Sequence, residues 1–135
     1  MATHTVTNQP PPRTGLDEFA VNTALCEAID RLAPEADRGE LHRIGSLVGS
    51  AAFQRDAELA NTQPPVLHTH DRWGHRVDEV EFHPAYHTIL GEALRSGAHS
   101  HAWQHPGPGA TLERAARFML YAQVEAGHAC PVSMT

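Results

Sequence analysis

The stretch Thr111–Ala126, TLERAARFMLYAQVEA, decides the fold. Apolar side chains recur along it at helical spacing and form a wide arc, made of Leu112, Ala115, Ala116, Phe118, Met119, Leu120 and Ala122. We expect the remaining side, which carries Arg114, Arg117 and Glu125, to stay polar and solvent-facing. A helix with so wide an apolar arc is covered on most sides by other elements. The stretch therefore predicts a packed helix in a mainly α domain.

The preceding sequence supplies further helices with clear start and stop signals. Asn22 is a suitable N-cap for a short helix that Pro34 stops, with an apolar face of Leu25, Ala28, Ile29 and Leu32. Asp37 and Glu40 have the spacing of a capping box, which opens a second helix. The apolar positions of that helix are Leu41, Ile44, Val48, Ala51 and Ala52.

Two glycines lie four residues apart in the second helix, at Gly45 and Gly49. Because glycine has no Cβ, the pair either lets another backbone come close or marks a kink near Gly49. The helical pattern continues through Leu59 and ends before Pro64.

The next stretch changes to the period of β-structure. Residues 66–70 and 76–82 flank a turn in which Gly74 can supply a positive φ, so we predict a β-hairpin over about 66–82. A lone two-stranded ribbon is marginally stable in water. We therefore expect the hairpin to pack on the helices or on a neighbouring chain.

A further helix follows the hairpin. His83 and Pro84 read as an N-cap with proline at the first helical position, and Gly97 reads as the residue that closes the helix. A loop containing residues 106–109, Pro-Gly-Pro-Gly, then leads to the last helix.

Composition and charge exclude several classes of function. The formal net charge is −6 and no basic cluster is present, which disfavours binding to nucleic acid. No apolar run reaches the ~20 residues that span a bilayer, and the polar, Pro-rich N-terminus lacks the pattern of a secretory signal. We therefore expect no membrane association and a cytoplasmic location, in which Cys26 and Cys130 are free thiols.

The eleven histidines invite a metal-binding interpretation. The pairs with chelating spacing are His68 and His70, His83 and His87, and His99 and His101. No His-Glu-x-x-His or Cys-x-x-Cys motif accompanies them, and no nucleophile elbow, P-loop or Gly-x-Gly-x-x-Gly motif is present. We favour surface and capping roles for these histidines and assign no metal-ligating, catalytic or cofactor-binding residue.

Four residues are candidate contacts with a partner: Trp73 at the hairpin turn and the prolines of the N-terminal arm, Pro10, Pro11 and Pro12. We expect Trp103, in contrast, to fill the core. Gln123 falls inside the apolar arc of the last helix. A buried amide needs hydrogen-bond partners, so we expect Gln123 to bind a neighbouring backbone, with a ligand contact as the alternative.

Several stretches together resemble the adaptive-response (AidB-like) branch of the acyl-CoA dehydrogenase flavoprotein family. The strongest is Arg114–Gly127, RAARFMLYAQVEAG, followed by Cys130–Thr135, CPVSMT. The others, in the family's order, are TVTNQPPP at 5–12, ALCEA at 24–28, LAN at 59–61 before Pro64 and Pro65, and FHPAYH at 82–87.

The resemblance implies an N-terminal helical domain of acyl-CoA dehydrogenase type with one small β-hairpin. We expect residues 1–15 to form an extended Pro-rich arm and residues 16–135 to form this domain, with the family's β-domain and C-terminal helical domain absent. The Met-Thr-Glu and Gly-Ser-Asp motifs that help the family to hold flavin are missing, and Met134-Thr135 does not replace them.

The resemblance also implies α,β-dehydrogenation of an acyl-CoA, with FAD as hydride acceptor, in the full assembly only. We expect the chain to act there as a structural and substrate-side scaffold, to bind no cofactor alone, and to be inactive alone. Its expected partners are the missing domains, on the same or a separate chain, and further copies in a homo-oligomer. The alternatives are a stand-alone helical interaction module and a His-rich metal-binding domain.

Overall fold

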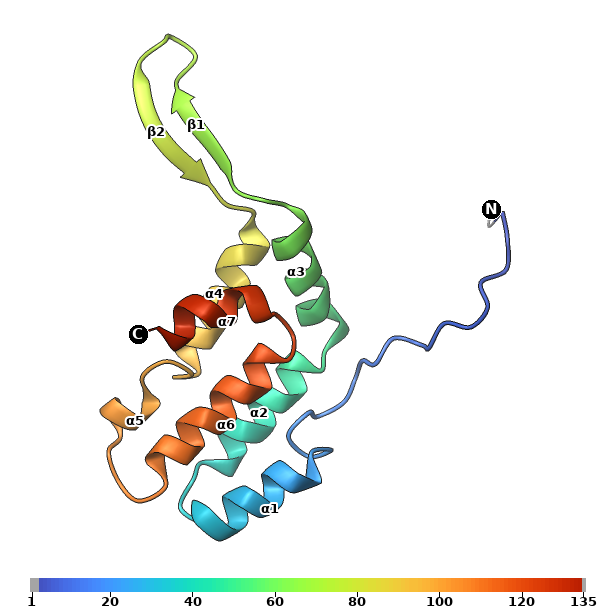
Figure 1. Ribbon diagram of the computed structural model, residues 1–135, viewed down its shortest axis with the longest axis vertical. Helices are drawn as coiled ribbons and strands as arrows, with labels where there is room; N and C mark the ends of the chain where they lie inside the picture. Colours follow the sequence, from blue (N-terminus) through green and yellow to red (C-terminus); the bar gives the residue numbers. More distant parts are fainter. Residues whose placement is uncertain (1–2, 135) are drawn as a thin grey trace.

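The computed structural model describes residues 3–134. Within that range the elements follow one another as a helical body interrupted by one hairpin: α1 (Thr23–Leu32), α2 (Arg38–Val48), α3 (Ala51–Thr62), β1 (Val66–His70), β2 (Arg76–Glu81), α4 (Pro84–Arg95), α5 (His101–Gln104), α6 (Ala110–Ala122) and α7 (Ala126–Ser133). Figure 1 shows the hairpin projecting from one end of the helical body, and the N-terminal segment extending away from its side. The mainly α fold with one small hairpin is therefore confirmed.

Local capping signals fix the starts of the helices as predicted. The Asn22 side chain accepts a hydrogen bond from the Leu25 amide (3.1 Å), and that of Asp37 accepts one from the Glu40 amide (3.0 Å). His83 Nδ1 accepts one from the Ala85 amide (3.1 Å), and proline occupies the first turn. These bonds satisfy amides that a helix leaves without an intrahelical partner.

Gly45 and Gly49 fulfil both of their predicted roles. The helix breaks at Gly49, and the segment 15–19 lies against α2 at both glycines. The Gly15 amide donates to the Gly49 carbonyl (2.7 Å), and the Glu18 amide donates to the Gly45 carbonyl (3.1 Å). A Cβ on Gly49 would lie 1.9 Å from the Leu16 carbonyl oxygen, so no larger residue fits without displacing that segment.

The core lies where α6 packs against α1, α2, α5 and α7, while α3 packs against α4. Its fully buried large side chains are Phe19, Ile29, Leu41, Ile44, Val48, Ile89, Leu120, Tyr121 and Val132. Three expectations for the last helix were wrong. Met119 is 46% exposed, whereas Arg117 and Glu125 are buried. Each of these two charged residues is buried because it has partners elsewhere in the fold.

The predicted last helix is in fact two helices. α6 ends at Ala122, and Glu125 in an extended conformation caps the start of α7. Glutamate is not a preferred N-cap residue, so the sequence gives little warning of this break. The buried polar residues of the predicted helix therefore lie in two places, Arg117 within α6 and Glu125 at the start of α7.

The hairpin is confirmed, but nothing in the described part of the chain covers it. β1 and β2 pair antiparallel, Gly74 has φ +88° in the turn, and an irregularity between His68 and His70 lies opposite Asp78, whose φ is +48°. Every residue of both strands is exposed. The hairpin joins the body through Phe82, which stacks on Tyr86 with ring centroids 4.2 Å apart. Of the two predicted environments, packing on the helices was therefore wrong.

Candidate functional site

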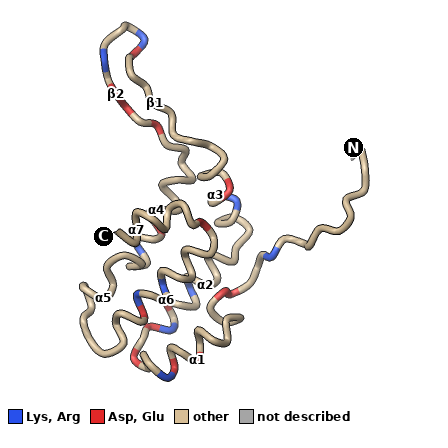
Figure 2. Tube along the Cα trace, viewed as in Figure 1, with Lys and Arg blue, Asp and Glu red and all other residues tan. Residues whose placement is uncertain are grey.

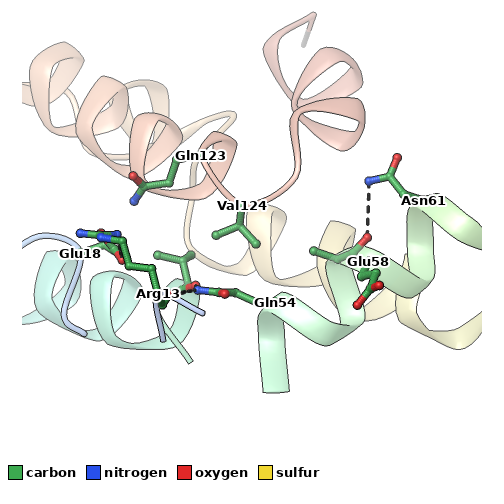
Figure 3. Close-up of a pocket in the computed structure, with 9 residues that line it drawn as sticks. Arg13, Glu18, Gln54, Glu58, Asn61, Gln123 and Val124 are labelled. Carbon is green, nitrogen blue, oxygen red and sulfur yellow. Dashed lines mark hydrogen bonds and ion pairs between the residues drawn. The ribbon is translucent and has the colours of Figure 1, made fainter. Parts of the chain in front are cut away.

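The candidate site is a polar hollow of about 420 Å³ between the N-terminal segment, α3 and the end of α6 (Figure 3). It is lined by Arg13, Glu18, Val48, Gln54, Ala57, Glu58, Asn61, Gln123 and Val124. Arg13 forms an ion pair with the buried Glu18, and Gln54 Nε2 donates to the Arg13 carbonyl (3.0 Å). The N-terminal segment thus forms one wall of the hollow through bonds to α3.

Gln123 points toward this hollow, where Figure 3 shows its amide near Arg13 and Glu18. The expectation that Gln123 is buried was wrong, because its side chain is exposed. The helix ends directly before Gln123, so the apolar arc that placed it in the core does not extend this far.

Behind the hollow, a buried carboxylate holds the bend between α6 and α7. Glu125 is 3% exposed and accepts hydrogen bonds from Asn61 Nδ2 (2.7 Å), the Gly127 amide (3.0 Å), the His128 amide and His128 Nδ1. Burial alone would raise the pKa of Glu125, but the bonds from His128, Asn61 and Gly127 outweigh burial and hold this pKa below its ordinary value. Glu125 is therefore an ionised structural acceptor rather than a general base.

Two polar atoms beside this carboxylate have no hydrogen-bond partner among the described residues, namely Tyr121 Oη and His128 Nε2. The His128 ring packs on Tyr86 with centroids 4.6 Å apart. Burial raises the pKa of Tyr121, with a further contribution from Glu125, so its hydroxyl stays protonated at neutral pH.

A second hollow, of about 590 Å³, lies between α2, α5 and α6 and contains a buried ion pair. Arg117 donates to Glu113 (2.5 Å) and to the Ser96 carbonyl (2.8 Å), which explains why it lies in the interior. His101 Nε2 lies 3.3 Å from Glu113 Oε1. Burial and then the Arg117 charge lower the pKa of His101, which favours its neutral form.

The histidine pairs with chelating spacing do not assemble with carboxylates or cysteines into a metal site among the described residues. Between residues 3 and 134, no group of three or more His, Cys, Asp or Glu side chains is arranged to hold a metal ion. His68 instead contacts Glu81 (2.7 Å), and His83 caps α4. Nor does any helix in that range have the length and apolarity needed to cross a membrane.

A third hollow, of about 310 Å³, is lined by His99, Ser100, Ala102, Trp103, Thr111, Arg114 and Ser133. Trp103 is 71% exposed here, so the expectation that it fills the core was wrong. It lies on the short α5, which packs against α6. The apolar character of tryptophan alone did not predict that this side chain is exposed.

Trp73 and the three prolines remain predictions as partner contacts. Trp73 is 74% exposed at the hairpin turn, with the Arg72 guanidinium 5.2 Å from its ring centroid. Pro10, Pro11 and Pro12 are exposed in the segment that extends away from the body (Figure 1). The structure does not bring Trp73 and these prolines together in one surface.

Comparison with known proteins agrees with this architecture. Residues 8–135 match the family described as the adaptive response protein AidB N-terminal domain. The putative acyl-CoA dehydrogenase AidB of Escherichia coli K12 is 43% identical over 134 residues, which cover 98% of this chain but 25% of that protein. The chain thus spans about a quarter of the length of this curated relative.

Two solved structures share the fold. ACDH-11 of Caenorhabditis elegans, solved in complex with C11-CoA, aligns with 96% of this chain and 23% of its own, at a TM-score of 0.76 and 20% identity. The apo form of Bd2924 aligns with 85% of this chain and 24% of its own, at a TM-score of 0.73 and 22% identity. The chain belongs to the family of AidB N-terminal domains, within the acyl-CoA dehydrogenase-like proteins.

Proposed function

We propose that this chain is the N-terminal part of an FAD-dependent, acyl-CoA dehydrogenase-like protein, in which it is a structural and substrate-side scaffold. The observation that carries the proposal is the 43% identity to AidB over 98% of the chain. Identity of this extent supports a role equivalent to that of the corresponding quarter of AidB. The reaction would be α,β-dehydrogenation of an acyl-CoA, and the chain would be inactive alone, in the cytoplasm and as part of a homo-oligomer.

The two larger hollows do not by themselves fit FAD. A pyrophosphate needs backbone amides or cations around it. The hollow in Figure 3 sets one arginine, already paired with Glu18, against a second carboxylate on Glu58. The second hollow is lined by Glu35, Asp37, Glu40 and Glu113 against the single Arg117. The linings of these two hollows therefore support a flavin held by residues outside this chain.

What the described residues supply is a rigid frame. The bonds of Glu125 fix the direction in which α7 leaves α6, and Asn61 ties that bend to α3. Precise placement of a wall around a reacting substrate is a recognised contribution to catalysis. We infer that this frame holds α7 in a fixed direction within the full assembly.

A chimera tests the proposal. The first quarter of Escherichia coli AidB would be replaced by this chain, and bound FAD would be measured by visible absorbance, followed by bleaching of the flavin on addition of acyl-CoA. We expect a yellow protein whose flavin bleaches as in the parent. A folded chimera of parental size that neither holds FAD nor bleaches would contradict the scaffold role. The same absorbance scan on the 135-residue chain alone should show no flavin.

A further inference from the structure

The third hollow, of about 310 Å³, differs from the other two in the charge of its wall. The two larger hollows each set at least two carboxylates against one arginine. The third is lined by Arg114 and by no carboxylate. Figure 2 shows the reason, since residues 96–112, which include α5 and the loop after it, carry no Asp, Glu, Lys or Arg. On a chain of net charge −6, this hollow is therefore the one suited to an anion.

The charge of Arg114 is not neutralised within the described part of the chain. Its guanidinium lies 5.3 Å from the ring centroid of Phe118, one turn further along α6, and pairs with no described carboxylate. The adjacent Glu113 is bonded to Arg117 and lines the second hollow instead. A guanidinium binds a carboxylate or a phosphate through two parallel N–H groups. Arg114 has these donors available.

Two polar groups in the wall also lack hydrogen-bond partners among the described residues. Ser100 is 8% exposed, and neither its Oγ nor Nδ1 of His99 is bonded. Buried groups of this kind are rare in native structures, because each one left unpaired costs free energy. A serine hydroxyl rotates to suit the acceptor that it meets. The position of both groups in the wall of one hollow indicates that a ligand completes their hydrogen bonding.

Helix α6 begins at the same hollow. Thr111 is the second residue of α6 and, with Arg114 three residues later, lines the hollow from one face of the helix. The N-cap residue, Gly109, supplies no side-chain acceptor. The first turn of a helix carries a partial positive charge that favours anions. The helix end and Arg114 thus contribute positive potential to the same space.

We propose that this hollow binds an oxyanion, the carboxylate or phosphate group of a ligand, through the Arg114 guanidinium and the hydroxyls of Ser100 and Thr111. This inference does not depend on the proposed flavoprotein role. The anion is either free in solution or the side chain of an Asp or Glu in the remaining length of an AidB-like protein, of which this chain spans about a quarter. Both sources present the same chemistry to the hollow, and two experiments separate them.

The first experiment uses the 135-residue chain with Trp73→Phe, which leaves Trp103 in the wall as the only tryptophan. Its fluorescence would be followed while inorganic phosphate or acetate is added at constant ionic strength, and we expect a saturable change. Arg114→Gln should raise the dissociation constant by about tenfold or more, because a charge-assisted bond is lost. The matched control is Arg55→Gln in α3, an exposed arginine that lines none of the three hollows, and it should leave this constant unchanged.

Ser100→Ala tests the unpaired hydroxyl while the charge of Arg114 is retained. We expect the dissociation constant to rise by about threefold or more. Stability without the anion should not fall, because the hydroxyl has no partner among the described residues. A change in stability with unaltered binding would instead assign Ser100 a purely structural role and remove it from the site. No saturable change in the wild type, or equal effects of Arg114→Gln and Arg55→Gln, would overturn the proposal.

The second experiment finds the source of the anion in the chimera with Escherichia coli AidB. Arg114 would be modified with phenylglyoxal, an arginine-specific reagent, and quantified by mass spectrometry with Arg55 as the internal control. Phosphate that slows the modification of Arg114 in the chimera identifies a free anion.

A carboxylate from the remaining chain gives a different result in the same chimera. Arg114 would then be protected without phosphate, and Arg114→Gln would lower stability more than Arg114→Lys, which keeps the positive charge. Protection without this advantage of lysine over glutamine would show that an uncharged group fills the hollow, and it would overturn the proposal.

Discussion

The helical body and the hairpin use apolar residues in opposite ways. In the body, residues such as Ile29, Leu41 and Ile89 are fully buried among several helices. In the hairpin, Leu67 and Trp73 are 59% and 74% exposed, and no strand residue is buried. Folding of this chain therefore buries the apolar residues of the helical body. The apolar residues of the hairpin, in contrast, are left exposed by the described part of the chain, and their contact with a partner remains a prediction.

The largest expected contrast comes from the same substitution made in both regions. Leu41→Ala removes a side chain with 0% exposure and should lower the free energy of unfolding by about 2–5 kcal/mol. Leu67→Ala should change it by no more than about 0.5 kcal/mol, because this side chain is already in water. Denaturation followed by circular dichroism measures both, at a protein concentration low enough to suppress association. Equal losses would show that the hairpin packs on the body after all.

A pair of glycines locates the boundary between the body and its N-terminal segment. Gly49→Ala places a methyl group 1.9 Å from the Leu16 carbonyl oxygen, so we expect a loss of about 1–3 kcal/mol as segment 15–19 is displaced. Gly91→Ala in α4 meets nothing within 4 Å and should stabilise the protein by up to about 1 kcal/mol. If Gly49→Ala were neutral in the same denaturation experiment, segment 15–19 would not be part of the folded body.

The carboxylates of the two regions also differ in burial: Glu125 is buried in the helical body, whereas Asp71 lies in the hairpin turn. The pKa of Glu125 is held below its ordinary value of 4.5 in the folded protein, so its stabilising contribution is present above about that pH and is lost as the pH falls through the lower folded value. Glu125→Gln should cost about 1–2 kcal/mol at pH 7 and make the decline in stability below about pH 4.5 shallower.

Asp71 in the hairpin turn provides the control for this pH dependence. Hydrogen bonds from His75 and neighbouring amides also lower the pKa of Asp71. The turn is not part of the core, however, so Asp71→Asn should leave the acid limb of body unfolding unchanged. An acid limb that Glu125→Gln does not alter would mean that other groups, such as Asp17, account for it.

Sequence reasoning succeeded where the signal is local and failed where the partner is distant. Asn22, Asp37 and His83 bond amides two or three residues away, so their roles follow from short-range spacing. The bend before α7 combines local bonds from the Gly127 and His128 amides to Glu125 with a bond from Asn61, 64 residues from Glu125. The spacing of apolar residues predicted that the last helix continues through this bend. Such spacing gives no information about which polar residue has a hydrogen-bond partner far away in the sequence.

Arg117 illustrates the same limit, since its carbonyl acceptor on Ser96 is 21 residues away. At the candidate site, the sequence identified no residue of the hollow in Figure 3 except Gln123, which it placed in the core. The hollow is assembled from three separate segments, and only the fold brings them together. The hairpin could be predicted from its turn residues and from the alternation of its side chains. That no helix packs on it could not be predicted from the sequence.

The smallest expected effect tests whether the buried polar groups of the helical body have hydrogen-bond partners. Tyr121 is 1% exposed, and its hydroxyl has no hydrogen-bond partner among the described residues. Removing a buried hydroxyl that has no hydrogen-bond partner also removes the cost of desolvating it, so the effect is near neutral or stabilising. Tyr121→Phe should therefore change the free energy of unfolding by less than about 0.5 kcal/mol, and any change should be an increase. Trp73→Phe is the matched aromatic change in the hairpin and should leave this free energy equally unaffected, because the ring is in water. A loss of more than about 1 kcal/mol for Tyr121→Phe alone would show that an internal water bonds this hydroxyl, and that the core beside Glu125 is hydrated.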